Sequence, residues 1–196
     1  MQNKTITTRK ADYPINEIFL KRWSARAMSG EEIKKEQLMS LFEAARWSPS
    51  SYNNQPWRFI YALKDTKHWN KFCNLLGEFN QSWAKNSSAL VILISKKNFE
   101  HNNTFSKTHS FDSGASWMSL ALQAQMNGLF THAMEGFDYD QARKELKIPA
   151  DYHIEVMIAI GKPGKKESLS IMLQEKESPS ERKKISELVM EGEFKI

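Results

Sequence analysis

Apolar residues recur along the chain at helical and strand spacings, and these spacings predict the order of its elements. Leucine, phenylalanine and alanine repeat at helical intervals between Leu38 and Ala45. This repeat predicts a helix from about Glu32 to Trp47, which Pro49 ends because proline disfavours the α conformation before it. A polar loop follows directly.

Four further segments are rich in β-branched, aromatic or continuous apolar residues and are predicted to be strands. They are residues 57–63, 89–95, 129–134 and 154–161. Between the first two strands we expect a helix capped by Thr66 and closed by Gly77, and a second short helix over residues 79–85.

A long helix is predicted to open at Asp112 and to end at Gly128, and few of its positions are polar. Such a helix is buried nearly all round. A second subunit could cover one side, which favours a homodimer, although a central helix wrapped by its own chain is the alternative. Asp138 with Gln141 forms a capping box for a later helix that stops at Pro149.

The predicted fold is of α+β class: a mixed, mainly antiparallel sheet with helices on both faces, in three α-β-α layers. No internal repeat or linker of different composition divides the sequence, so residues 1–196 are expected to form a single domain.

The net charge of +5 is modest, and it excludes few partners by itself. The sequence has no basic stripe with stacking aromatics, so we do not expect nucleic-acid binding, whereas a small anion such as a phosphate accounts equally well for the charge. The longest apolar run, residues 89–94, is far too short to cross a bilayer. A single cysteine, Cys73, and no signal-like stretch at residues 1–6 predict a cytoplasmic protein without a disulfide.

The loop at residues 48–57 (Ser-Pro-Ser-Ser-Tyr-Asn-Asn-Gln-Pro-Trp) differs most from ordinary scaffold. Its two prolines stiffen the backbone, while its hydroxyl and amide groups offer hydrogen bonds that no regular element uses. These features suit a polyhydroxylated or heteroaromatic ligand. A merely polar turn between a helix and a strand is the alternative.

A second candidate group, Arg22, Ser24 and Arg26, follows a short amino-terminal helix. Guanidinium groups bind phosphate through charge-assisted, often bidentate hydrogen bonds, and serine adds a neutral donor. Arg182, near the carboxy terminus, could add a further cation to the same phosphate. A solvated cap of the helix dipole is the simpler interpretation of such an arginine pair.

Taken in order, these motifs resemble the FMN-dependent nitroreductase family over nearly the whole sequence. The resemblance rests on Arg-Trp-Ser-Ala-Arg at 22–26, on the loop at 48–57, on Asn-Gln-x-Trp-Ala-Lys at 80–85, on Met-Glu-Gly-Phe-Asp at 134–138, on Gly-Lys-Pro at 161–163 and on Arg182.

The resemblance implies a homodimer with two FMN molecules at the subunit interface. It assigns the FMN phosphate to Arg22, Ser24 and Arg182, and the pyrimidine edge of the ring to Arg26. The remaining implied contacts are Pro49, Ser50 and Ser51 from the neighbouring subunit, Asn53 and Gln55 along the ribityl chain and ring edge, Asn80 at N3 and O4, and Gly136, with Met134 and Glu135 beside it, at N5.

The resemblance also implies a ping-pong cycle in which NADH or NADPH reduces FMN and a small aromatic acceptor, such as a nitroaromatic or a quinone, reoxidises it. FMN N5 carries the chemistry, so no catalytic side chain is expected. The five histidines show no metal-ligand spacing and are interpreted as surface or structural residues, and Cys73 as core filler.

Some positions depart from the commoner family pattern. Trp83 and Ser180 stand where many members have lysine, and residues 96–111 form a short polar connection where several relatives have a longer helical insertion. The alternatives are a flavoenzyme of the same fold with other chemistry, namely reductive dehalogenation or flavin breakdown, or a flavin-binding protein without turnover.

Overall fold

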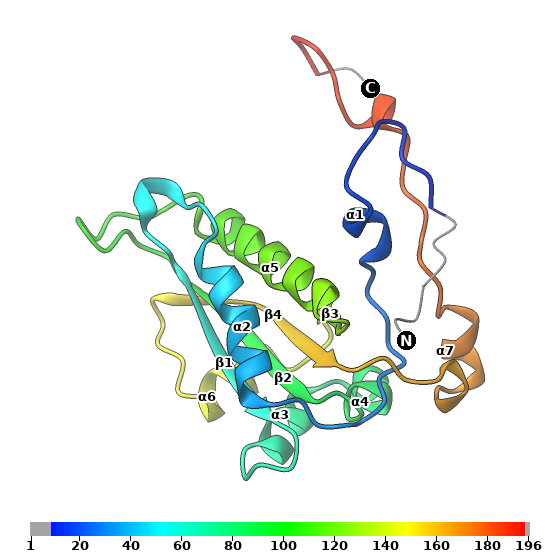
Figure 1. The fold of residues 1–196 in the computed structure, drawn as a ribbon. Helices are drawn as coiled ribbons and strands as arrows, with labels where there is room; N and C mark the ends of the chain where they lie inside the picture. Colours follow the sequence, from blue (N-terminus) through cyan, green and yellow to red (C-terminus); the bar gives the residue numbers. More distant parts are fainter. Residues whose placement is uncertain (1–8, 195–196) are drawn as a thin grey trace.

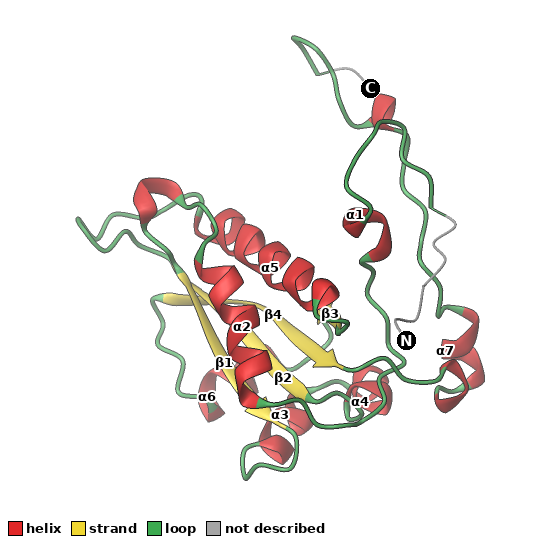
Figure 2. Cartoon of the chain, viewed as in Figure 1, coloured by secondary structure: helices red, strands yellow, loops and turns green. Residues whose placement is uncertain are grey.

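The computed structural model describes residues 9–194, and within them four strands form a sheet in the order β1-β2-β4-β3 (Figures 1 and 2). Every neighbouring pair is antiparallel. The strands are β1 (Trp57–Leu63), β2 (Ala89–Lys96), β3 (Phe130–Met134) and β4 (Tyr152–Gly161). The helices are α1 (Ile18–Lys21), α2 (Lys35–Arg46), α3 (Trp69–Leu75), α4 (Glu78–Ala84), α5 (His109–Met126), α6 (Tyr139–Glu145) and α7 (Ile171–Glu175), with short 3-10 turns at Ser51–Asn53, Lys166–Ser168 and Ile185–Glu187.

The sheet lies between two helical layers, and both of its faces are buried. On one face α2 and α5 pack over Val91, Leu93 and Ile158. On the other face α3, α4 and α6 pack over Ile92 and Met157. Because successive residues of a strand point to opposite faces and both faces are covered, β2 is apolar from Ala89 to Ile94, and all but its last residue is buried. The three-layer α+β prediction is confirmed.

Most predicted elements are present, but several begin elsewhere. The helix predicted from about Glu32 begins at Lys35, because Lys34 is extended and the Gln37 side chain accepts its backbone N–H at 3.0 Å. The long helix begins at His109 and not at Asp112, since the Asp112 N–H already donates to Thr108 O. Thr66 does not cap α3: its hydroxyl donates to Leu63 O, and the helix begins at Trp69.

The predicted cap of α6 is confirmed, because the Asp138 side chain accepts the N–H of Gln141 at 2.8 Å. The helix ends at Glu145, earlier than Pro149, and Lys147 has a left-handed φ of 55°. The four predicted strands agree with the observed ones to within two residues at each end.

Within one chain α5 is buried on one face only, so the prediction of burial nearly all round is wrong for the single chain. Its buried positions include Ser116, Leu120 and Ala124. Phe111 and Met126 near its two ends are 79% and 66% exposed. The helix therefore leaves apolar side chains uncovered by its own chain.

Two segments extend away from the sheet and helices (Figure 1). We call residues 9–22 the amino-terminal arm and residues 178–194 the carboxy-terminal arm. Arg9 Nε donates to Ser180 O at 2.9 Å, and Ile185 N donates to an Asp12 carboxylate oxygen, also at 2.9 Å. The amino-terminal arm then returns through α1 toward the sheet. No helix in residues 9–194 is long and apolar enough to cross a membrane. Residues 1–6, where the sequence predicts no export signal, lie outside the described range.

Candidate functional site

A pocket of about 290 Å³ forms where the two arms meet β3, and we call it the basic pocket. It brings Arg22, Ser24 and Arg26, which are near the amino terminus, together with Arg182, which is near the carboxy terminus. Its lining residues are Arg9, Arg22, Trp23, Ser24, Arg26, His132, Lys176, Ser178, Ser180 and Arg182. The convergence of these cations is a product of the tertiary fold, since regular elements contribute few of them.

Like charges crowd this pocket. Burial lowers the pKa of the Arg22 guanidinium, and the neighbouring charges of Arg9 and Arg182 lower it further. Burial also lowers the pKa of Arg9, again with a contribution from Arg182. A cluster of cations that repel one another is stabilised by an anion placed among them.

Arg9 was not anticipated as a pocket residue. Its guanidinium donates to Arg22 O at 3.0 Å and to Leu20 O at 3.3 Å, as well as to Ser180 O. It therefore ties the Arg22 backbone to the carboxy-terminal arm. A lone arginine near the amino terminus carries no motif, so only the fold could reveal its position.

His132 on β3 lines the same pocket, a place that the sequence did not indicate. Its Nδ1 donates to Ala25 O at 3.2 Å, and its ring packs against Trp83 with centroids 4.8 Å apart. Burial, followed by the charge of Arg26, lowers its pKa to about 4. The imidazole is therefore neutral at pH 7. Trp83 is 1% exposed and packs behind the His132 ring.

Asn80 and Gly136 form a second group beyond His132, at the end of β3. Asn80 Nδ2 donates to Gly136 O at 3.0 Å, and Gly77 N donates to the same oxygen at 3.1 Å. A Cβ atom on Gly136 would lie 2.7 Å from Asn80 Nδ2, so only glycine fits there without displacing Asn80. Met134 is buried and Glu135 is exposed.

The 48–57 loop, which its prolines predict to be stiff, contains left-handed backbone. Tyr52, Asn53 and Gln55 have φ values of 52°, 53° and 46°. Ser50 Oγ accepts the N–H of Gln55 at 3.0 Å, and Gln55 Nε2 donates to Asn53 O at 2.9 Å. Residues other than glycine adopt this conformation only when surrounding contacts hold it.

Those contacts come from the first turn and the middle of α5. The buried carboxylate of Asp112 accepts the N–H of Ser51 at 3.1 Å, and Ser119 Oγ lies 2.7 Å from Ser48 Oγ. Pro49 lies between these two anchors. The loop is thus fixed at both its beginning and its 3-10 turn.

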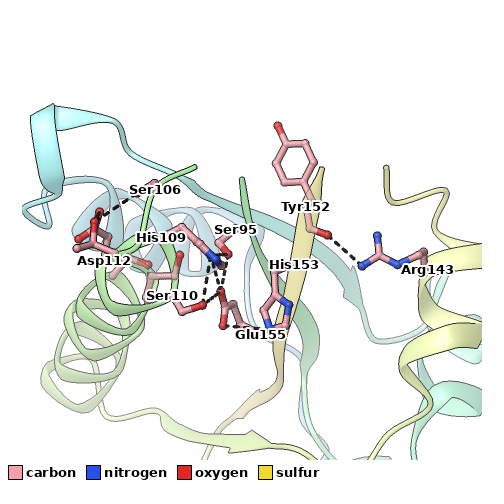
Figure 3. A network of polar contacts seen from close by, with 12 residues as sticks. Ser95, Ser106, His109, Ser110, Asp112, Arg143, Tyr152, His153 and Glu155 are labelled. Atoms are coloured by element: carbon pink, nitrogen blue, oxygen red, sulfur yellow. Dashed lines mark hydrogen bonds and ion pairs between the residues drawn. The ribbon is translucent and has the colours of Figure 1, made fainter. Parts of the chain in front are cut away.

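The first turn of α5 is in turn anchored to the sheet by a polar cluster (Figure 3). Ser95 on β2 donates a very short hydrogen bond to Glu155 on β4, so His109 Nδ1 donates to Ser95 Oγ at 2.7 Å. Ser110 Oγ donates to the same Glu155 oxygen at 2.9 Å. Ser95 is fully buried, so this serine, histidine and glutamate set is an anchor and has no nucleophile open to substrate.

Residues 97–108 fold back beside the loop, with a bridge between Asn98 and Phe105. The Tyr52 ring meets Phe99 edge-on at 5.6 Å, and Arg58 pairs with Glu100 at 3.1 Å. Together with the loop, this segment lines a second pocket of about 330 Å³. Phe99 and His101 thus lie against the loop, whereas His109 belongs to α5.

The basic pocket and the 48–57 loop lie at opposite ends of α5. The loop contacts Asp112 in the first turn. Near the other end, Trp23 beside the pocket packs on Phe130, four residues after the helix ends, with centroids 6.0 Å apart. An 18-residue helix is roughly 27 Å long. None of Pro49, Ser50, Ser51, Asn53 and Gln55 lines the basic pocket, so one chain does not bring them to the arginines.

Within residues 9–194 no group of three or more histidine, cysteine, aspartate or glutamate side chains is arranged to hold a metal ion. Cys73 is buried, and burial raises the pKa of its thiol to about 11. A thiol with that pKa is a poor nucleophile at neutral pH.

A sequence model described as the nitroreductase family matches residues 19–82 and 74–162. A solved oxidoreductase containing FMN is 42% identical to this chain, covers 96% of it and 97% of its own length, and superimposes with a TM-score of 0.93.

Two curated relatives are oxygen-insensitive NADPH nitroreductases. The protein from Helicobacter pylori is 40% identical over 67 residues, which are 34% of this chain and 30% of the relative. The protein from Helicobacter acinonychis is 36% identical over 103 residues, which are 51% of this chain and 48% of the relative. The matched regions thus span less than half the length of these curated relatives.

Proposed function

Because this chain belongs to the nitroreductase family, we propose that it is an FMN-dependent oxidoreductase that takes hydride from NADH or NADPH and reduces small aromatic acceptors, such as nitroaromatics or quinones, in a ping-pong cycle. The observation that supports this most is the convergence of Arg22, Arg26 and Arg182 in one pocket. The solved relative at 42% identity, an oxidoreductase containing FMN, supports the same cofactor.

The basic pocket fits a phosphate monoester. It offers several guanidinium groups and the hydroxyl-bearing residues Ser24, Ser178 and Ser180, and the mutual repulsion of Arg22 and Arg182 would be relieved by a dianion. Arg26 Nε is buried and has no hydrogen-bond partner among the described residues. Buried donors are almost always paired, so this atom favours a ligand acceptor. We assign the phosphate to Arg22, Ser24 and Arg182, and the pyrimidine edge of the ring to Arg26.

The end of β3 fits the flat ring. The close approach of Asn80 to Gly136 leaves no room for a side chain at residue 136, so the backbone there is open to a ligand. We assign the N3 and O4 side of the ring to the Asn80 amide, which can both donate and accept, and N5 to the Gly136 N–H. Met134 and Glu135 would flank this contact.

The 48–57 loop requires a second copy of the chain in this proposal, since α5 separates it from the arginines. We propose a homodimer with two FMN molecules, in which Pro49, Ser50 and Ser51, together with Asn53 and Gln55, contact the FMN held by the partner's arginines. The exposed apolar side chains Phe111 and Met126 on α5, and those on the two arms, support this assembly. Residues 1–196 would act as one domain, in the cytoplasm.

When bound, FMN supplies the redox chemistry by accepting hydride from reduced nicotinamide and passing it to the acceptor. Arg26 would stabilise negative charge at the pyrimidine edge, and Gly136 would orient the ring through its N–H. The stiff loop would hold the ribityl chain. We assign no side chain as a catalytic acid or base.

The direct test is purification followed by assays of flavin content and of NADH and NADPH oxidation with a nitroaromatic and a quinone under nitrogen. The proposal expects a yellow protein whose nucleotide oxidation depends on the acceptor. A protein that binds FMN without oxidising either nucleotide would limit the function to flavin binding, and one that does not bind FMN would overturn the proposal.

A further inference from the structure

Glu177 lies between α7 and the carboxy-terminal arm, and it contacts a segment of the chain about 150 residues earlier. Its Oε1 accepts the backbone N–H groups of both Arg26 and Ala27 at 2.8 Å. The residue is 9% exposed, which is unusual for a glutamate. Its neighbours Lys176 and Ser178 both line the basic pocket.

A buried carboxylate is costly unless hydrogen bonds replace its lost hydration. Here two consecutive amide N–H groups share one oxygen, while Oε2 is buried without a hydrogen-bond partner among the described residues. Two N–H groups that point at one carboxylate are charge-assisted hydrogen bonds, about twice as strong as neutral ones. The contact therefore fixes both the glutamate and the backbone that carries the Arg26 side chain.

The chain beyond Glu177 runs along the amino-terminal arm. From residue 180 to residue 194 every described position is exposed, Arg182 included. Hydrogen bonds from Arg9 to Ser180 O and from Ile185 to Asp12 join this arm to the amino-terminal arm. Arg182 donates to Ser180 and to Glu181, which belong to the same arm. Glu177 is thus the point at which the carboxy-terminal arm is held to the segment that carries Arg26.

We propose that Glu177 is a positioning residue that assembles the FMN phosphate site. It docks the carboxy-terminal arm on the Arg26–Ala27 backbone and so sets the positions of Arg26 and, five residues downstream, Arg182. The ligand part of this inference rests on the proposed function, whereas the contact between Glu177 and the two amides does not.

Three variants and one control separate the effect of the length of the residue 177 side chain from the effect of its charge. Glu177→Gln keeps an oxygen at the same distance and removes the charge, while Glu177→Asp keeps the charge and shortens the side chain by one methylene. Glu177→Ala removes both. Glu175→Ala is the matched control, because Glu175 lies two residues away and is exposed.

The first measurement is hydrogen exchange of the Arg26 and Ala27 amides in protein freed of flavin. We expect exchange to be faster by about tenfold or more in the Ala and Asp variants, since their amides lose the acceptor, faster by only about threefold in the Gln variant, which keeps the acceptor without its charge, and unchanged in the control. Unchanged exchange in the Ala and Asp variants would overturn the inference. Because this readout needs no flavin, it holds even if the proposed function fails.

The second measurement is the FMN dissociation constant from flavin fluorescence. We expect it to rise on the order of 10- to 100-fold for Glu177→Ala and Glu177→Asp, and to stay within about threefold of wild type for Glu177→Gln. Weakening in the Gln variant but not in the Asp variant would mean that charge matters and reach does not, which contradicts a positioning role. If wild-type protein does not bind FMN, the proposed function and the ligand part of this inference are both wrong. The contact between Glu177 and the two amides is not affected by that result.

Discussion

The basic pocket and the 48–57 loop are built in opposite ways. The pocket gathers charged side chains from both arms and from the segments next to them, several of them exposed and outside regular structure, beside the neutral imidazole of His132. The loop is one continuous, uncharged segment whose left-handed residues are held by Asp112 and by its own hydroxyl and amide groups. Charge supplies the attraction at the first site, and backbone stiffness supplies the shape at the second.

This difference indicates that the two sets of proposed FMN contacts contribute to binding in different ways. Guanidinium groups on long side chains can adjust to a phosphate, so their backbone needs a fixed anchor such as Glu177. A neutral loop attracts a ligand weakly, so it must already have its bound shape. In the proposed dimer each FMN site needs both protomers, because the two regions of one chain line separate pockets.

Subunit complementation should give the largest effect. One parent variant carries Arg22→Ala with Arg182→Ala, and the other carries Ser50→Ala with Asn53→Gly, where glycine keeps the backbone at φ 53°. Each homodimer should be nearly inactive. After subunit exchange at equal ratio, about a quarter of the sites combine an intact pocket with an intact loop, so about a quarter of wild-type activity should return.

One result would contradict the comparison. A mixture no more active than its parents would mean that the two regions serve the same protomer or no common site. The control is a single chain type carrying all four substitutions, which should remain inactive when mixed with either parent.

Arg22→Ala should weaken FMN binding by about 100-fold, since it removes a half-buried, charge-assisted contact to phosphate. Equilibrium dialysis followed by flavin absorbance measures the loss. Arg46→Ala is the matched control: Arg46 is exposed and pairs with Glu43 at 2.5 Å, away from the pocket. Equal flavin content in the two variants would contradict the assignment of the FMN phosphate to the basic pocket.

His132 should make the pocket side of the protein sensitive to acid. Its pKa is about 4 in the folded chain, against an ordinary value of 6.5, because burial and Arg26 disfavour the charged ring. The unfolded state therefore binds more protons between these values, so stability is lost as the pH falls from 6.5 toward 4. Between pH 7 and pH 5 we expect a loss of about 1 to 2 kcal/mol from this residue.

Urea unfolding at the two pH values tests this, with wild type compared with His132→Gln. The Gln variant should lose that part of the pH dependence, whereas His68→Gln, at an exposed position, should keep it. A His132→Gln protein with the same pH dependence as wild type would show that the imidazole charges without penalty.

Gly136→Ala should give the smallest effect, a loss of FMN affinity of about fivefold, because the new Cβ displaces the Asn80 amide from its 3.0 Å contact. The measurement is the same titration of flavin fluorescence. Gly114→Ala is the control, since no atom lies within 4 Å of its added Cβ on α5, and it should bind FMN normally and gain helix stability. Normal affinity in both variants would argue against a ring contact at Gly136.

Local patterns predicted the elements well and their ends less well. The apolar run of β2 and the Asp138 cap of α6 are local signals, and both are confirmed. The start of α5 was missed by three residues because His109 and Ser110 are held by Glu155 on β4, a contact with no local signal. The first turn of a helix is decided by whichever partners its free N–H groups and side chains find.

The candidate site was predictable to the extent that its residues carry motifs. Arg22, Ser24 and Arg26 and the 48–57 loop stand out as short patterns. Arg9, His132 and Glu177 do not, since a lone arginine, histidine or glutamate is ordinary in any sequence. Each takes its role from a neighbour far along the chain: Ser180, Trp83 and the Arg26 amide respectively.

The sequence by itself determined the order of helices and strands, the stiffness of the loop and the presence of phosphate-binding side chains, because each depends on residues close together in the chain. The tertiary structure alone decided that Arg22 and Arg182 share one pocket, that Glu177 docks the carboxy-terminal arm, and that α5 keeps the loop away from the arginines of its own chain. The physical reason is that charges and buried carboxylates act on whatever the fold brings within a few ångströms of them, and no local pattern records that distance.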